Sequence, residues 1–197
     1  MIITTHGRWV RAVNAVVCDK RNRAVRCWLA SALTLVPGLG VGAGPAAAPA
    51  DAQAELLRGQ ETELRATLAA SATIVRRSDD TLTLAYPVRL GFVPDLPQLR
   101  PAFTAVLDEL ARSLRRHPRT LLAVAVYTDA IGRREFNQAQ SQQRAEAIAT
   151  YLAGRGVDRG RIQARGAGES EPLPAPNTPE GRDLNRRVEL TISALSS

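Results

Sequence analysis

The chain has 197 residues, of which 45% are hydrophobic, 23% are charged and 4% are aromatic. This composition suits one globular domain with a core of aliphatic side chains. No apolar run reaches the roughly 20 residues that a membrane-spanning helix needs, which excludes a polytopic membrane protein. Two Cys and two His residues are too few for a zinc finger or a disulfide scaffold, so we expect no metal and no cofactor.

The net charge of +7 lies mostly at the N-terminus. Residues 1–50 carry six basic side chains and one acidic side chain, whereas residues 51–197 carry 20 Arg and 18 acidic side chains. A remainder with so little excess charge attracts a polyanion weakly, so we expect no nucleic-acid partner.

The first 50 residues have the pattern of a targeting segment. Their basic residues end at Arg26, an apolar run spans residues 27–36, and Ala48-Pro49-Ala50 fits a cleavage signal before Asp51. We therefore expect a signal peptide that is cleaved near Ala50, with an uncleaved membrane anchor as the alternative. No small residue precedes either cysteine of this segment, so lipid attachment is not expected.

Residues 51–80 are expected to form a lead-in of one amphipathic helix and one hairpin. Leucines recur at roughly helical spacing within residues 51–70. Two β-prone runs, residues 73–75 and 81–84, flank Ser78-Asp79-Asp80, which is typical of a β-hairpin.

From Pro101 onward, helical and strand patterns alternate. Apolar residues between Phe103 and Leu114 follow the spacing of an amphipathic helix, which is expected to end near His117-Pro118. The continuous apolar run over residues 121–127 predicts a strand that is buried on both faces.

A second helix is expected to end near Gly154, and a short strand follows at residues 161–164. A proline-rich loop over residues 171–179, a short helix and an alternating strand at residues 187–192 complete the chain. These elements predict an α+β fold, a two-layer sandwich in which one mixed β-sheet carries helices on one face. The apolar face of the second helix would comprise Phe136, Ala145, Ile148, Ala149 and Leu152.

No pattern typical of catalysis occurs after the leader. The single histidine there, His117, lies at a predicted helix end. The sequence contains no nucleophile elbow, no P-loop and no zinc-protease motif. We therefore expect that the protein is not an enzyme.

Polar residues around the end of the apolar strand could line a cleft. Asp129 follows the strand, and Asn137, Ser141 and Arg144 share one face of the next helix, expected to lie opposite or oblique to its apolar face. A carboxylate and a guanidinium in such a cleft would hold the two charges of a zwitterion. A plainer alternative stays open, in which Asp129 caps the helix and Arg144 is a solvated charge.

Residues from about 81 to 194 resemble the OmpA-like domain, the peptidoglycan-binding module of outer-membrane proteins. We therefore divide the chain into a targeting segment at 1–50, a lead-in at 51–80 and an OmpA-like domain at 81–197. The matching residues are Phe92, Asp95, Leu99-Arg100-Pro101, Thr128-Asp129, Gly132, Asn137, Ser141, Arg144-Ala145, Leu152, Gly156-Val157, Arg161-Ile162, Gly166, Gly168-Glu169, Pro172, Asn177, Gly181-Arg182 and Asn185-Arg186-Arg187-Val188-Glu189.

The resemblance implies a small exported protein that binds peptidoglycan non-covalently, at the diaminopimelate of the peptide stem. Such a protein would tether the outer membrane of a Gram-negative bacterium to its cell wall, with an outer-membrane or envelope protein as a further partner. We expect it in the periplasm, associated with the outer membrane. The alternative is a membrane-anchored stator-type or transport-type subunit that carries the same wall-binding module.

The resemblance also implies a role for each motif residue. Asp129 would bind the ammonium of diaminopimelate and Arg144 its carboxylate, while Asn137 and Thr128 would complete the pocket. Arg187 would lie at the rim, near the glycan or the peptide backbone. A second group would form a structural rim and fix the loop before the last strand: Arg182, Asn185 and Arg186.

The chain departs from the family pattern in two loops. The family usually has Gly-His where this chain has Val126-Tyr127, and Val93-Pro94 interrupt a Phe-Asp-Phe motif in the first loop. These changes bear on the shape of the loops, whereas Asp129 and Arg144 are both present.

Overall fold

The computed structural model describes residues 49–195, apart from residues 70, 72, 79 and 80. The predicted targeting segment lies outside this range except for its last two residues, where α2 begins. The strands are β1 (Ile74–Arg77), β2 (Thr81–Pro87), β3 (Thr120–Tyr127), β4 (Ile162–Gly168) and β5 (Arg187–Ala194). The helices are α2 (Pro49–Thr67), α3 (Val88–Gly91), α4 (Pro101–Arg116), α5 (Arg134–Gly154) and α6 (Pro179–Asn185), with a 3-10 turn, η1, at Arg159–Arg161.

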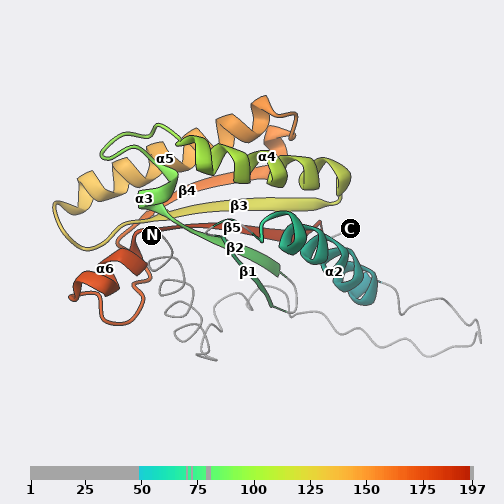
Figure 1. Ribbon diagram of the computed structural model, residues 1–197, viewed down its shortest axis with the longest axis horizontal. Coiled ribbons are helices and arrows are strands. Elements are labelled where there is room, and N and C mark those ends of the chain that lie inside the picture. Colours follow the sequence, from blue (N-terminus) through green and yellow to red (C-terminus); the bar gives the residue numbers. More distant parts are fainter. Residues whose placement is uncertain (1–48, 70, 72, 79–80, 196–197) are drawn as a thin grey trace, which may run out of the picture.

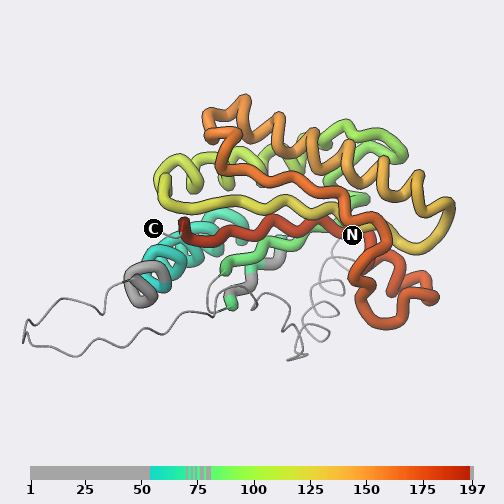
Figure 2. Tube along the Cα trace, turned by 180° about the vertical axis from the view of Figure 1, so that it is seen from behind, coloured from blue at the N-terminus to red at the C-terminus, as the bar shows by residue number. Residues whose placement is uncertain are grey.

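The five strands form one mixed sheet in the order β1-β2-β5-β3-β4 (Figure 1). β3 and β4 are parallel, and the other neighbouring pairs are antiparallel. The strands bury one face in a single hydrophobic cluster with α2, α4 and α5. This arrangement confirms the predicted α+β sandwich with helices on one face. In both views, α6 lies at the end of the sheet where β3 leads into α5 (Figures 1 and 2).

β3 is buried on one face only, so the prediction of burial on both faces was wrong. Leu122, Val124 and Val126 are at most 1% exposed, whereas Ala123 is exposed and Ala125 is partly exposed. Residues 121–127 form a continuous apolar run in the sequence because alanine counts as apolar. An alanine side chain is small, however, so its exposure places little apolar surface in water. The sheet therefore has one covered face and one open face.

α5 buries polar and apolar side chains on adjoining faces, so of the two predicted arrangements the polar face is oblique to the apolar one and not opposite to it. Asn137, Ser141 and Arg144 are buried, like Ile148 farther along the helix. They lie oblique to Ala145, Ala149 and Leu152 on the buried side of the helix. Hydrogen bonds to neighbouring elements satisfy Asn137 and Ser141. Phe136, predicted on the apolar face, is 60% exposed.

Polar side chains of α5 bind the backbone of β4, which is an edge strand of the sheet. Gly166 N–H donates to Gln142 Oε1 at 2.7 Å, and Gln138 Nε2 donates to Gly166 O at 2.7 Å. Gly168 N–H donates to Ser141 Oγ at 3.0 Å. These bonds occupy backbone groups that an edge strand otherwise leaves free. They also fix α5 at a set height over β4.

The lead-in helix and hairpin predicted before residue 81 are both present and join the core of the rest. β1 and β2 pair as an antiparallel hairpin, and two leucines of α2 and one just after it are buried in the common cluster. Gln60 Nε2 donates to Ser113 Oγ at 3.1 Å, and both residues are fully buried between α2 and α4. The buried leucines are Leu57, Leu64 and Leu68.

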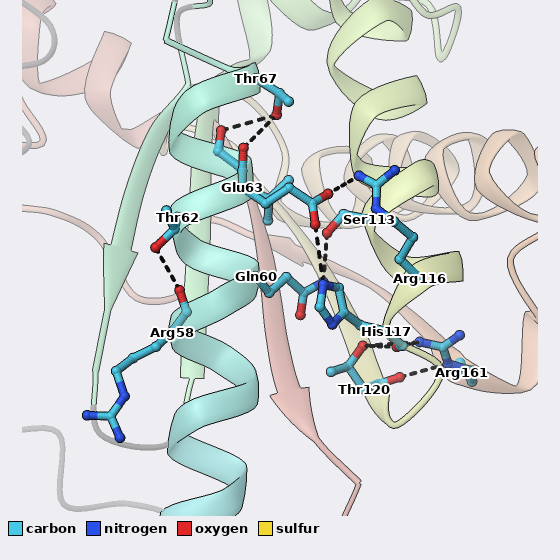
Figure 3. Close-up of polar contacts among 11 residues, drawn as sticks. Arg58, Gln60, Thr62, Glu63, Thr67, Ser113, Arg116, His117, Thr120 and Arg161 are labelled. Carbon is cyan, nitrogen blue, oxygen red and sulfur yellow. Dashed lines mark hydrogen bonds and ion pairs between the residues drawn. The ribbon is translucent and has the colours of Figure 1, made fainter.

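Glu63 adds a charged contact between α2 and α4 (Figure 3). Its carboxylate accepts a hydrogen bond from Arg116 and lies 3.3 Å from His117 Nε2. Burial alone would raise the pKa of Glu63, but the hydrogen bonds from Arg116 and His117 outweigh it and hold the pKa below the ordinary value. The contact therefore stabilises the docking of α2 while Glu63 is ionised.

We expect Glu63→Gln to lower the melting temperature at pH 7, and the difference from wild type to vanish in acid. A depressed carboxyl pKa contributes stability above the pKa of the unfolded chain, and this stability is lost as the pH falls through the folded pKa. The difference should be complete above the pKa of a Glu in the unfolded chain, about 4.3, and should shrink as the pH falls below it. Thermal unfolding followed by circular dichroism measures it. Glu55→Gln, at a side chain that is 75% exposed on the same helix, should show no such effect.

Candidate ligand-binding site

A cleft of about 390 Å³ lies where β3 ends, between α3, the start of α5 and the junction of α6 with β5. Three guanidinium groups and two carboxylates line it, together with apolar side chains. The charged lining residues are Arg89, Asp95, Asp129, Arg144 and Arg186. Opposite charges in the lining of one cleft suit a ligand that carries both an ammonium and a carboxylate.

Asp129 presents its carboxylate to this cleft. Its Oδ1 accepts a hydrogen bond from Ile131 N–H at 3.2 Å, and its Oδ2 pairs with Arg186. The side chain is 13% exposed. The alternative in which Asp129 caps α5 is wrong, because the helix begins at Arg134 and the cap position is Arg133.

Arg144 is a buried cation in the lining of the same cleft. It is 7% exposed, so the alternative of a solvated charge is wrong. Its guanidinium lies 5.5 Å from the centre of the Phe92 ring, and its Nε has no hydrogen-bond partner among the described residues. Burial lowers the pKa of Arg144 below its ordinary value, and the charge of Asp95 partly opposes this shift. A buried N–H donor without a partner costs free energy, which an acceptor on a ligand would recover.

Asn137 and Thr128 hold and border the loop that carries Asp129. Asn137 Nδ2 donates to Asp129 O at 3.3 Å and to Ile131 O at 3.1 Å. Thr128 N–H donates to Gly168 O at 2.7 Å. Its Oγ1 is buried and has no partner within the part of the chain that the structure describes. The structure thus brings together four of the residues predicted to bind the ligand: Thr128, Asp129, Asn137 and Arg144.

Arg187, predicted at the rim, does not line the cleft. It is 4% exposed, its guanidinium lies 3.8 Å from the centre of the Tyr127 ring, and its Nε donates to Glu189 at 2.7 Å. Side chains alternate along a strand, and Val188 points into the helix-covered core, so Arg187 points to the other face of the sheet. Burial is the main cause that raises the pKa of Tyr127, to about 12.

The three residues predicted at the structural rim divide into two groups. Asn185 accepts from Leu173 N–H and donates to Gly181 O, both at 2.7 Å, and so holds the loop before α6. Arg182 donates to Asn177 O at 2.8 Å. Arg186 instead enters the cleft and pairs with Asp129, a role that the sequence reasoning missed. Arg186 caps α6 and β5 begins only at Arg187, so no alternation pattern in the sequence marks this role.

Residues 91–186 match the model of the OmpA family. These residues form an OmpA-family domain. The first two strands and α2 precede the matched range but pack into the same core. Among the residues that the structure describes, no helix has the length and apolarity needed to cross a membrane, and no group of three or more His, Cys, Asp or Glu could hold a metal ion.

Two curated relatives and one solved structure show how far the OmpA-family similarity extends. The probable lipoprotein YiaD of Escherichia coli (strain K12) is 38% identical over 136 residues, which are 69% of this chain and 62% of the relative. The peptidoglycan-binding protein ArfA of Mycobacterium bovis is 36% identical over 104 residues, which are 53% of this chain and 32% of the relative. This chain therefore spans less than two thirds of the length of either relative.

The similar solved structure is the cell wall anchor of the type VI secretion system from Pseudomonas aeruginosa. It aligns with a TM-score of 0.59 and 29% identity, over 66% of this chain and 96% of that chain. The OmpA-family fold of this chain thus agrees with a structure of related sequence.

Proposed function

We propose that this protein binds peptidoglycan non-covalently and ties an envelope layer to the cell wall. The observation that carries the proposal is Arg144, a buried cation whose Nε finds no acceptor among the described residues, in the same cleft as the Asp129 carboxylate. Two names among the similar proteins, a peptidoglycan-binding protein and a cell wall anchor, point in the same direction.

The ligand in this proposal is the diaminopimelate of the peptide stem. Its free end carries an ammonium and a carboxylate on one carbon atom, which matches a cleft lined by both carboxylates and guanidinium groups. Asp129 binds the ammonium, and Arg144 binds the carboxylate through its unsatisfied N–H donor. Thr128 Oγ1 offers a further hydrogen bond, and Asn137 holds the Asp129 loop in place. Arg187 acts at a distance from the ligand, as a packing partner of Tyr127.

The proposal includes the cellular setting. The protein would be exported by a signal peptide that is cleaved near Ala50, and would act in the periplasm of a Gram-negative bacterium, at the outer membrane. It would bind the wall without cleaving it. An outer-membrane or other envelope protein would be its second partner.

We expect the purified protein to co-sediment with diaminopimelate-containing sacculi and to release no soluble fragments. Sacculi with lysine in place of diaminopimelate should bind more weakly, because lysine lacks the carboxylate that Arg144 would hold. Bound protein is measured in the pellet, and muropeptides are measured in the supernatant by chromatography. Equal binding to both wall types would contradict the diaminopimelate site. Muropeptide release above that of a heat-denatured control would instead indicate an enzyme.

A further inference from the structure

Arg186 bridges two carboxylates at the edge of the cleft. Its Nη1 donates to Asp129 Oδ2, and its Nη2 donates to Asp183 Oδ1. Its backbone is fixed, because its N–H donates to Arg182 O at 3.0 Å and its carbonyl accepts from Val88 N–H at 2.9 Å. The side chain is 38% exposed. Any rearrangement here therefore concerns the side chain of Arg186 and leaves its backbone in place.

We infer that Arg186 is an internal counter-ion, which holds the ammonium position on Asp129 until the ammonium of a ligand displaces it. This inference rests on the proposed function. Asp129 is 13% exposed, and a carboxylate so far removed from water is costly without a cation beside it. Its Oδ1 is held by Ile131 N–H, so Oδ2 is the oxygen for which Arg186 and a ligand compete.

Asp183 makes the exchange easy. It lies on α6 one turn before Arg186, and its side chain is 44% exposed. When an ammonium takes Asp129, the guanidinium keeps its contact with Asp183 and gains water on its exposed side. One ion pair is lost and one is formed, so no buried charge is left alone. A ligand without an ammonium cannot take over the ion pair with Asp129, so the cleft should prefer ligands that carry a cationic group.

Arg144 and Asp129 differ in what a ligand must displace to reach them. Arg144 has no hydrogen-bond partner for its Nε among the described residues, so a ligand carboxylate displaces no hydrogen bond from that atom. The ammonium meets Arg186. Removal of Arg186 should therefore strengthen ligand binding, whereas removal of a residue that touches the ligand should weaken it. This difference in sign separates a displaced counter-ion from a direct ligand contact.

The test is calorimetric titration of the full-length protein with free meso-diaminopimelate. Arg186→Gln should bind this probe about 3- to 10-fold more tightly than wild type, because one competing ion pair is gone. Asp183→Asn should bind more weakly, by about 2- to 5-fold, since Arg186 then has only Asp129 as its anion. Arg182→Gln is the matched control on the same helix, bonded to Asn177 O outside the cleft, and should leave the affinity unchanged.

The outcomes separate this inference from the proposed function. If wild type and Asp129→Ala bind the probe equally, or neither binds it, the proposed function is wrong. If wild type binds and Asp129→Ala does not, but Arg186→Gln binds no more tightly than wild type, only the counter-ion inference is wrong. Thermal unfolding checks that each variant is folded. Should Arg186→Gln unfold, Arg186→Met serves instead, because it keeps an unbranched side chain without the competing charge, and it should also bind more tightly.

Discussion

Asp129→Ala and Arg144→Ala should each abolish most binding to peptidoglycan sacculi. Each change leaves one charge of the zwitterionic ligand facing no partner in a partly enclosed cleft. The loss of one partner of such a pair costs about 2–5 kcal/mol, or roughly 30-fold to several-thousand-fold in affinity. Arg144→Lys should also weaken binding, because an ammonium does not reproduce the flat fork of a guanidinium. Co-sedimentation over a range of protein concentrations measures these affinities.

The stability of the Arg144 variants gives this prediction a second readout. The wild-type cation is buried and lacks a partner for Nε, so an apolar side chain of similar length removes a desolvation cost. We expect Arg144→Met to lose wall binding while its melting temperature stays equal to that of wild type or rises. Arg155→Ala, at an exposed arginine beside Asp108, should bind normally. Normal wall binding by a folded Arg144→Met or Asp129→Ala would refute the assignment of the site.

Gly166→Ala should destabilise the fold severely. A Cβ atom at this position would lie 2.3 Å from the backbone nitrogen of Gln142 and 2.7 Å from Ser141 Oγ. α5 would have to move away from β4 and break the hydrogen bonds that join them. Overpacking together with lost hydrogen bonds costs about 3–5 kcal/mol, which corresponds to a fall in melting temperature of roughly 6–20 °C.

Gly154→Ala is the matched control for this substitution. It is the last residue of α5, where a Cβ atom would meet nothing within 4 Å, and alanine favours a helix over glycine. We therefore expect its stability to equal or exceed that of wild type. Gly166→Ala should also weaken wall binding, because Asn137 and Arg144 move with α5. A melting temperature of Gly166→Ala within 2–3 °C of wild type, or about 1 kcal/mol, would show that α5 and β4 tolerate separation.

Elements with a strong local signal could be predicted from the sequence. The apolar spacing from Phe103 to Leu114 placed α4 correctly, and the proline after His117 marked its end. The two charges of the cleft, Asp129 and Arg144, followed from their positions after a strand and within a helix, together with the family motif. These features depend on a few neighbouring residues, which is the range over which a sequence pattern carries information.

The direction in which polar side chains of α5 point depends on contacts between residues far apart in the sequence, which no local pattern contains. The spacing of Asn137, Ser141 and Arg144 predicted one polar face, opposite or oblique to the apolar face, that lines a cleft. In the structure Asn137 and Ser141 are buried, since the Asp129 and Ile131 carbonyls and the Gly168 N–H satisfy them. These partners lie up to 27 residues away along the chain, so their positions depend on the packing of α5 on β4.

The sequence placed Arg187, and not Arg186, beside the ligand pocket for a related reason. Both are arginines in one short motif, and the family resemblance placed the second at the ligand. The register of β5 decides the outcome, because Val188 pairs with Val126 of β3 and points into the core. Arg187 consequently faces the open side of the sheet, while Arg186 remains in the turn and reaches Asp129.

The hydrogen bonds from side chains of α5 to the backbone of β4 would matter when many copies of the protein are bound to one peptidoglycan sacculus. A sacculus repeats the same stem peptide at close intervals, so bound copies would reach high local concentration. Free strand edges at such density invite pairing between neighbouring molecules and then aggregation. Gln138, Ser141 and Gln142 occupy backbone groups of β4, and the opposite edge strand, β1, is only four residues long. Copies of the protein bound close together on the cell wall would therefore have little tendency to pair through their strand edges.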